Sequence, residues 1–198
     1  MIQLHEFGPT RSARCLWTLN ELGVPFERIE VDLPHGEHKK PPFLALNPMG
    51  RVPVLVCDGA VMTESFAICT WLADRHPEAG LIPAPGSPDR AVHDRWVFFC
   101  ATELDAPLWR IRRNKILLPD AQRVPADIPS AAADFKAAGA VLQAELRERE
   151  FLVGDRLTVA DIVLSHTLFW STWNDLLDDL PGLQAYLQRH LQRPSCPL

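Results

Sequence analysis

The pair Val52-Pro53 is the residue pattern in this chain that points most directly to chemistry. An X-Pro peptide bond adopts the cis form at a cost of only about 0.5–1 kcal/mol, and a cis bond at the start of a strand turns the preceding main chain outward. The N–H and C=O of Val52 are therefore expected to pair with an extended, peptide-like ligand, as an added strand would pair.

A second polar pair, Glu64-Ser65, follows shortly after Pro53 and comes directly before an apolar run with helical spacing. The start of a helix offers unpaired N–H groups and the positive end of a dipole, which suit a carboxylate. The side chain of Glu64 adds an acidic partner for an ammonium group. This short stretch therefore predicts main-chain pairing, an anion site and a cation site close together.

Residues 1–76 switch repeatedly between the period of a strand and that of a helix. Such a mixture predicts a small mixed sheet covered by helices. In chain order we expect a strand at 2–7, a helix at 12–22, a strand at 26–31, a loop at 35–42, a hairpin turning at Asp58-Gly59 and a helix at 64–75.

Residues 77–88 are rich in proline and glycine and predict a linker, after which residues 89–198 follow helical spacing throughout. Pro107 falls inside the first helical stretch and is expected to kink it. Thr158 and Asp161 predict a capping box at the start of a later helix. Because aspartate replaces the usual glutamate, we expect its reciprocal bond to be weakened.

Three motifs together resemble the glutathione S-transferase superfamily, specifically a cytosolic bacterial type with Ser or Thr, not Tyr, at the thiol site. They are Asn47-Pro-x-Gly-x-Val-Pro53 with Glu64-Ser65, the run Leu157-Thr-Val-Ala-Asp161-Ile, and the opening run from Thr10 to Pro25. The resemblance implies an α/β plus all-α fold class: an N-terminal thioredoxin-like domain at 1–76 that binds glutathione, then an all-helical C-terminal domain at 89–198.

Carried onto this sequence, the resemblance gives residues 52 and 53 the pairing with the cysteinyl part of glutathione through a cis bond. It gives Glu64 and Ser65 the γ-glutamyl end, although a plain helix start is the alternative for this pair. Arg51 would reach the glycyl carboxylate, with His38 and Lys39 as second candidates. The alternatives are that Arg51 is a turn cation and that His38 and Lys39 are solvated loop residues.

The group that activates the thiol is expected in the loop after the first strand. Many relatives use a tyrosine there, but Tyr186 is the only tyrosine in this chain and lies far away in sequence. Thr10 and Ser12 are the hydroxyls available, with Thr10 favoured as the main donor. Ser12 serves as an auxiliary donor or simply as a helix cap.

The second substrate, a small hydrophobic electrophile, is expected in a cleft walled by Phe7, Trp109 and Arg113, with core packing as the alternative for Trp109. The resemblance implies a detoxifying transferase that conjugates glutathione, as a homodimer. Glutathione-dependent reduction of disulfides or peroxides is one alternative. A non-catalytic binding protein on the same scaffold is another.

The composition of the chain limits the classes of partner that it can bind. The net charge of −5 argues against nucleic acid, and the sequence lacks both an export signal and a run of about eighteen apolar residues, so we expect a cytoplasmic protein without membrane contact. The cysteines are odd in number and form no C-x-x-C pair, which favours reduced thiols. No spacing predicts a metal site or a nucleotide loop. Glutathione, as the resemblance implies, is expected as co-substrate, with no metal.

Overall fold

The computed structural model describes residues 1–147 and 149–198. These form two compact units, one made of residues 1–84 together with 193–198, the other of residues 85–192. The domain limits drawn from the sequence, 1–76 and 89–198, remain predictions. They assign the end of the chain to the second domain. By its contacts, segment 193–198 belongs with the first.

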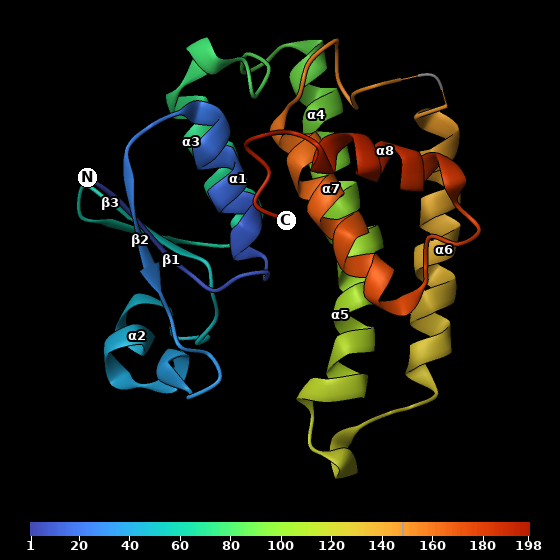
Figure 1. Cartoon of the computed structure of the whole chain (residues 1–198), viewed down its shortest axis with the longest axis horizontal. Coiled ribbons are helices and arrows are strands. Elements are labelled where there is room, and N and C mark those ends of the chain that lie inside the picture. The colour runs from blue at the N-terminus through green and yellow to red at the C-terminus, as the bar shows by residue number, and fades with distance from the viewer. Residues whose placement is uncertain (148) are drawn as a thin grey trace. The chain divides into compact units, whose positions relative to one another are not determined.

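The first unit is built on a four-stranded sheet (Figure 1). The order of its strands is β2-β1-β3-β4. β1 runs parallel to β2, whereas β3 is antiparallel to both β1 and β4. The β3–β4 connection turns at Asp58 and Gly59, whose φ angles of 51° and 83° are those of the predicted tight hairpin. The strands are β1 (Ile2–Glu6), β2 (Phe26–Glu30), β3 (Val54–Cys57) and β4 (Ala60–Thr63).

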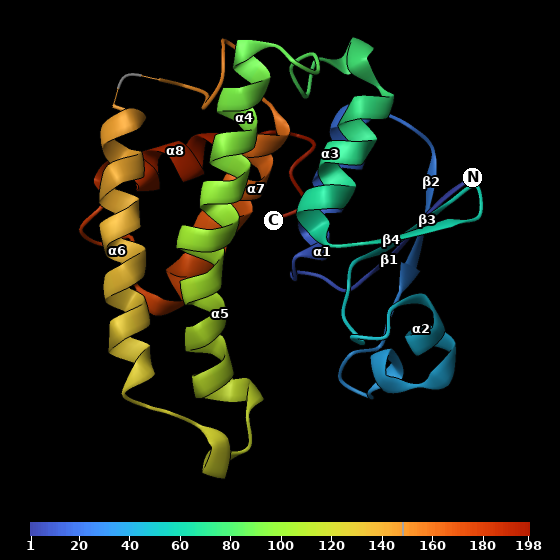
Figure 2. The ribbon, with the colours of Figure 1, turned by 180° about the vertical axis from the view of Figure 1, so that it is seen from behind.

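Two helices, α1 (Ser12–Leu22) and α3 (Ser65–Arg75), pack against each other, and α1 also packs on β1 (Figure 2). The short helix α2 (Pro41–Leu46) belongs to a separate apolar cluster, in which Phe43 meets Val31 and Val54. Because side chains alternate along a strand, Val54 and Leu55 point to opposite faces of the sheet. The sheet therefore has apolar packing on both faces.

The loop predicted at 35–42 is wrong in part. A 3₁₀ turn, η1, occupies Glu37–Lys39, and α2 already begins at Pro41. Proline fits the first turn of a helix, where the N–H groups have no helical partner in any case. The prolines that suggested a loop therefore start a helix.

The second unit opens with a long helical segment that changes its winding. It comprises α4 (Pro88–Phe99), the π-helix η3 (Cys100–Asp105), α5 (Ala106–Arg112) and the π-helix η4 (Arg113–Leu117). The residues that join these pieces keep right-handed helical dihedrals. Pro107 has no N–H to donate to the carbonyl four residues earlier. Widened π turns lie before the proline in η3 and after it in η4, and the kink expected at Pro107 stays a prediction.

Helix α7 (Val159–Ser171) is buried around nearly its whole circumference, so it forms the centre of this unit. Its start carries the predicted capping box. The Asp161 carboxylate accepts hydrogen bonds from the Thr158 N–H at 2.7 Å and the Thr158 hydroxyl at 2.8 Å. The reciprocal bond is thus as short as an ordinary charge-assisted one, contrary to the weakening we expected.

The same carboxylate of Asp161 reaches further than the cap. It accepts from the N–H of Leu152 at 2.7 Å and from the hydroxyl of Tyr186 at 2.6 Å. Tyr186 lies on α8 (Pro181–Leu191), which packs against α7. One buried carboxylate therefore fixes the preceding loop, the start of α7 and the side of α8.

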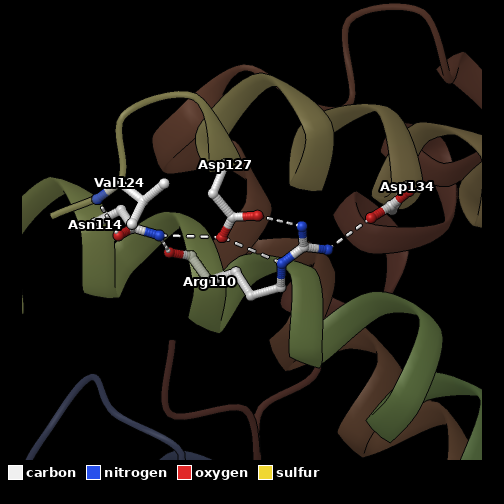
Figure 3. A network of polar contacts seen from close by, with 5 residues as sticks. All are labelled: Arg110, Asn114, Val124, Asp127 and Asp134. Atoms are coloured by element: carbon white, nitrogen blue, oxygen red, sulfur yellow. Dashed lines mark hydrogen bonds and ion pairs between the residues drawn. The ribbon is translucent and has the colours of Figure 1, made fainter.

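Helix α6 (Asp127–Glu145) is joined to the end of α5 by a polar network (Figure 3). Arg110 pairs with Asp127 and, at 2.6 Å, with Asp134. Asn114 donates to Asp127 at 3.1 Å and accepts from the N–H of Val124 at 2.9 Å. These contacts hold the segment that connects the two helices against both of them.

The end of the chain returns to the first unit. Arg193 and Ser195 donate to the carboxylate of Glu21 near the end of α1, with a shortest Arg193 distance of 2.7 Å. Asn20 donates to the main-chain oxygen of Ser195 at 2.9 Å. The tail is thus held by the C-terminal turn of α1.

Four cysteines are buried, namely Cys15, Cys57, Cys69 and Cys100, while Cys196 in the tail is partly exposed, and all five are free thiols. Within the described residues, none of the helices has the length and apolar character needed to cross a lipid bilayer.

Candidate functional site

The register of the sheet brings the predicted ligand-binding segments to one end of it. Val54 pairs with His5 on β1 and with Thr63 on β4. Because β3 is antiparallel to both neighbours, the residues before Val54 lie beside those that follow β1 and β4. The turn after β1, the pair Val52-Pro53 and the pair Glu64-Ser65 therefore meet at the same edge.

The turn after β1 is held by its own hydroxyl groups. The hydroxyl of Thr10 lies 2.5 Å from the main-chain oxygen of Phe7 and 3.0 Å from the hydroxyl of Ser12. The Ser12 hydroxyl accepts from the N–H of Phe7 at 3.4 Å. Ser12 is fully buried, whereas Thr10 is half-buried. Of the two candidate donors, Thr10 is the one with surface exposed to a ligand.

Ser12 is not the N-cap of α1. The helix begins at Ser12, and Arg11 occupies the capping position. The N–H of Ser12 is instead satisfied by the hydroxyl of Thr10 at 3.3 Å. The alternative role considered for Ser12, a simple helix cap, therefore does not apply, because Arg11 occupies that position.

The pair Glu64-Ser65 stands at the start of α3, as predicted. Glu64 is exposed and has a φ of 68°, in the left-handed region that non-glycine residues adopt at a cost of order 1–3 kcal/mol. Its main-chain oxygen accepts the first helical bond, from Ile68 at 2.9 Å. Strain of this kind persists when the surrounding structure imposes it, and it is frequent at ligand sites.

A buried arginine joins the two helix starts. The guanidinium of Arg14, which has no exposed surface, donates to the hydroxyl of Ser65 at 3.1 Å and lies 4.5 Å from the ring centre of Phe66. The N-termini of α1 and α3 both present positive dipole ends here. A cationic side chain and two helix starts therefore make this end of the sheet favourable for an anion.

The Val52–Pro53 peptide bond is cis, as the sequence predicts, and the Gly8–Pro9 bond is cis as well. Among the described residues, none makes a main-chain hydrogen bond to Val52. Pairing of this main chain with a ligand stays a prediction.

Two further predicted residues lie next to the turn that precedes Arg51. The ammonium group of Lys39 donates to the main-chain oxygens of Met49 and Gly50, at 3.4 and 3.2 Å. The main-chain oxygen of His38 lies so close to Gly50 that a Cβ there would be 2.7 Å away. The structure therefore brings His38 and Lys39 against the segment that carries Arg51.

His38 is only partly solvated. Burial, together with the charge of Lys39, lowers the pKa of His38 below its ordinary value of 6.5. Its Nδ1 atom is buried without a hydrogen-bond partner among the described residues. A neutral imidazole is the expected form at neutral pH, which makes the ammonium of Lys39 and the exposed guanidinium of Arg51 the better partners for a carboxylate.

The residues predicted for the second substrate are divided between the units. Phe7 belongs to the first, and Trp109 and Arg113 belong to the second. Phe7 and Trp109 are half-buried, and Arg113 is exposed. Their joint role stays a prediction.

Sequence reasoning missed Arg14 and the role of Gly50. Arg14 stands in an otherwise apolar stretch of α1, and an isolated charge on a buried helix face was the signal that would have identified it. Gly50 has a φ of 58°, and its close contact with His38 explains the glycine in the Asn47-Pro-x-Gly motif. For metals, the described part of the chain contains no cluster of three or more His, Cys, Asp or Glu side chains that could hold an ion.

Comparison with known families agrees with this architecture. Residues 10–75 match the model of the glutathione S-transferase N-terminal domain. Residues 101–189 match the model of the glutathione S-transferase C-terminal domain. The two matches follow each other in the order in which the units occur.

Individual relatives are similar over most of their length. Glutathione S-transferase GstA of Escherichia coli O157:H7 is 32% identical over 185 residues, which cover 90% of this chain and 87% of the relative. Glutathione S-transferase F10 of Arabidopsis thaliana is 32% identical over 155 residues, covering 76% of this chain and 72% of the relative. The chain therefore belongs to the glutathione S-transferase family.

Solved structures agree. The ternary complex of BphK, a bacterial GST, is similar with a TM-score of 0.87 and 30% identity, covering 98% of this chain and 95% of that one. The glutathione transferase URE2P8 from Phanerochaete chrysosporium with oxidized glutathione gives a TM-score of 0.85 and 25% identity, covering 98% and 91%. The predicted fold class, a thioredoxin-like domain followed by a helical domain, is confirmed.

Proposed function

We propose that this protein binds glutathione at the edge of the sheet where the Val52, Ser65 and Thr10 segments meet, and conjugates its thiol to small electrophiles. The main chain of Val52 pairs with the cysteinyl part. Ser65 and Glu64 hold the γ-glutamyl end, and Arg51 with Lys39 holds the glycyl carboxylate. The observation that supports this arrangement most is the convergence of these segments at one edge, next to the buried Arg14.

Thr10 is the proposed thiol partner. A cysteine thiol has a pKa of about 8.5, and lowering it by two units requires about 2.7 kcal/mol of preference for the anion. A hydrogen bond to a charged acceptor contributes about 1.5–3 kcal/mol, and the start of α1 adds a favourable dipole. Ser12 supports Thr10, because its hydroxyl is fully buried and 3.0 Å from that of Thr10.

The electrophile is a small hydrophobic molecule. Proximity of the bound thiolate to the electrophile supplies the remaining rate gain.

Substitution of Thr10 tests the thiol assignment. Thr10→Val keeps the shape but removes the hydroxyl, and it should raise the pKa of bound glutathione and lower kcat roughly ten- to hundredfold. Thr10→Ser is the matched control and should retain most of the activity. The thiolate is measured by its ultraviolet absorbance during a pH titration, on wild type and both variants. Equal turnover in Thr10→Val and Thr10→Ser would reject the role of Thr10.

The same preparations separate the competing activities. Conjugation is followed with chlorodinitrobenzene and glutathione-dependent reduction with hydroxyethyl disulfide. We expect the first to dominate. Reduction without conjugation would favour a redox enzyme, and calorimetry without any glutathione binding would favour a non-catalytic binding protein.

We further propose that the protein is a cytoplasmic homodimer. An ion pair of 3.9 Å joins Arg95 on α4 to Glu145 on α6. About one turn along each helix on the same side, Phe98 and Val141 are 68% and 58% exposed. Large apolar side chains exposed on the same face of a molecule are typical of an interface. Analytical ultracentrifugation of wild type and Phe98→Glu tests this, and a monomeric wild type would contradict it.

A further inference from the structure

Two cysteines of the first unit face each other across the contact between α1 and α3. The Sγ atoms of Cys15 and Cys69 lie 3.9 Å apart, and neither residue has any exposed surface. The sulfur of Cys15 also lies 3.9 Å from the main-chain oxygen of Ser65. The pair is thus shielded from solvent and touches the first residue of α3.

The separation is suitable for a cross-link. A disulfide bond has a length of about 2.05 Å, so the two sulfur atoms must approach by about 1.9 Å. Rotation of a cysteine side chain between staggered rotamers displaces its sulfur by a distance of this order. Helices α1 and α3 already pack against each other, so the helices do not have to travel to bring the pair together.

The two thiols differ in their readiness to ionise. Burial raises the pKa of Cys15 well above its ordinary value. Burial acts in the same direction on Cys69, but hydrogen bonds from Cys15 and Thr18 and the charge of Arg14 outweigh it and lower the pKa of Cys69. The Sγ atom of Cys15 also lies beside the main-chain oxygen of Ser65, which disfavours a thiolate at Cys15, so Cys69 is taken as the nucleophile and Cys15 as the thiol that completes the bond.

We propose that Cys15 and Cys69 form a disulfide when the protein meets a small hydroperoxide, and that this disulfide weakens the binding of glutathione. The first part stands on the geometry of the two thiols alone. The second part rests on the proposed function, because it requires Ser65 to hold the γ-glutamyl end.

The chemistry proceeds in two steps. The sulfur of Cys69 attacks one oxygen of the hydroperoxide, the O–O bond breaks, and the alcohol, or water in the case of hydrogen peroxide, leaves. Cys69 is then a sulfenic acid. The sulfur of Cys15 attacks that of Cys69, the S–O bond breaks, and the hydroxyl leaves as water with the proton of Cys15. The two thiols lose two electrons and two protons, and the peroxide is reduced.

Burial selects the oxidant. With no exposed surface on either residue, a local opening admits hydrogen peroxide, which is close to water in size, far more readily than a disulfide of glutathione dimensions. The pair is therefore oxidised by peroxide and not by large disulfides. Once formed, the buried disulfide is protected from reduction by bulky thiols.

The link to the ligand site runs through adjacent residues. Arg14 precedes Cys15, and its guanidinium donates to the hydroxyl of Ser65 at 3.1 Å. Closing the sulfur pair by a rotamer change turns the sulfur of Cys15 away from the main-chain oxygen of Ser65, next to the residue that Arg14 binds. We expect this to disturb the Arg14–Ser65 hydrogen bond on which the anion site depends.

The experiment treats the reduced full-length protein with hydrogen peroxide and maps its peptides by mass spectrometry without reduction. The expected product is a Cys15–Cys69 cross-link that has lost two hydrogen atoms and is reversed by dithiothreitol after unfolding. Cys100→Ala, which alters another buried thiol, should form the same product, and Cys69→Ala should not. The first part is overturned if both thiols remain free while Cys196 is oxidised.

Ligand affinity is then measured by calorimetry with S-methylglutathione, which has no thiol and cannot reduce the cross-link. We expect the oxidised protein to bind it at least about fivefold more weakly, the effect of losing roughly one hydrogen bond. Equal affinity of both forms overturns the second part. Cross-linking in a protein that shows no affinity in either form refutes the proposed function and leaves the modification site established.

Discussion

The guanidinium of Arg14 and the hydroxyl of Ser65 form a fully buried hydrogen bond of 3.1 Å between the first turns of α1 and α3. The two residues lie 51 positions apart in sequence, yet they fix the relative position of both helix starts. The site at the edge of the sheet therefore depends on a residue that need not touch the ligand.

Arg14→Gln should weaken glutathione binding by about tenfold or more, because Ser65 loses its donor and the site loses a buried positive charge. Calorimetric titration checks this. In a double-mutant cycle with Ser65→Ala, the two effects should be strongly non-additive. Additive effects would show that Arg14 acts independently of Ser65.

Gly50→Ala should lower the free energy of unfolding by about 1–3 kcal/mol more than a comparable glycine substitution. Both Gly50 and Gly36 have positive φ angles, but only at Gly50 would a Cβ meet the main-chain oxygen of His38, at 2.7 Å. Gly36→Ala is therefore the matched control, since it carries the dihedral cost alone. Urea unfolding of both variants measures the difference. Equal losses would mean that the contact is readily relaxed.

Tyr186 should not ionise until the protein unfolds. Burial, and then the charge of Asp161, raise the pKa of this phenol well above its ordinary value of 10.0. The unfolded chain therefore loses a proton that the folded chain keeps, and stability falls as pH rises above 10.0. Because Tyr186 is the only tyrosine, its ultraviolet titration is free of overlap. A step near pH 10.0 in protein that is still folded by circular dichroism would refute this placement.

The tail contact at Glu21 should weaken in acid. Burial opposes ionisation of Glu21, but hydrogen bonds from Arg193, Ser195 and Trp17 prevail and lower its pKa below the ordinary value of 4.5. The stabilisation is therefore fully present above pH 4.5 and is lost as pH falls through the lower folded-state pKa.

Glu21→Gln should cost about 0.5–1 kcal/mol at neutral pH, a modest value because Arg193 is 35% exposed and solvent screens the pair. The difference from wild type should vanish well below pH 4.5. Urea unfolding of wild type and variant, at neutral pH and again well below pH 4.5, measures the free energy of unfolding. A difference that persists unchanged in acid would assign the effect to packing of the side chain.

His93 on α4 should make the protein less stable below neutral pH. Burial is the main cause that lowers its pKa from 6.5, against the opposing effects of Asp94 and Asp161, while Arg90 adds to the lowering. As pH falls below 6.5, the unfolded chain binds a proton that the folded chain refuses, so stability decreases until the folded-state pKa is reached.

The variant His93→Gln should reduce this decrease, with His35→Gln as the control, because the side chain of His35 is 82% exposed. Thermal unfolding at a series of pH values between about 7.5 and 5 supplies the comparison. If His93→Gln shows the wild-type slope, another group is responsible for the acid sensitivity.

Much of the fold could be read from the sequence because its signals are local. The alternation along the strands, the turn at Asp58-Gly59 and the proline-rich stretch near residue 80 each reflect the conformational preferences of the residues themselves. The capping box at Thr158 and Asp161 could also be predicted, since its two members are close in sequence.

Features that depend on distant partners could not be read in this way. Burial of Arg14 depends on Ser65, and the hydrogen bond from Tyr186 to Asp161 joins helices whose pairing no local pattern encodes. The π turns before Pro107 were expected only as a kink, because a missing N–H indicates that helical bonds must change but not how they rearrange.

The return of Arg193 and Ser195 to Glu21 has a consequence for how the protein is made. The first unit is complete only once residues 193–198 have also been synthesised, so expressing residues 1–84 alone removes part of that unit.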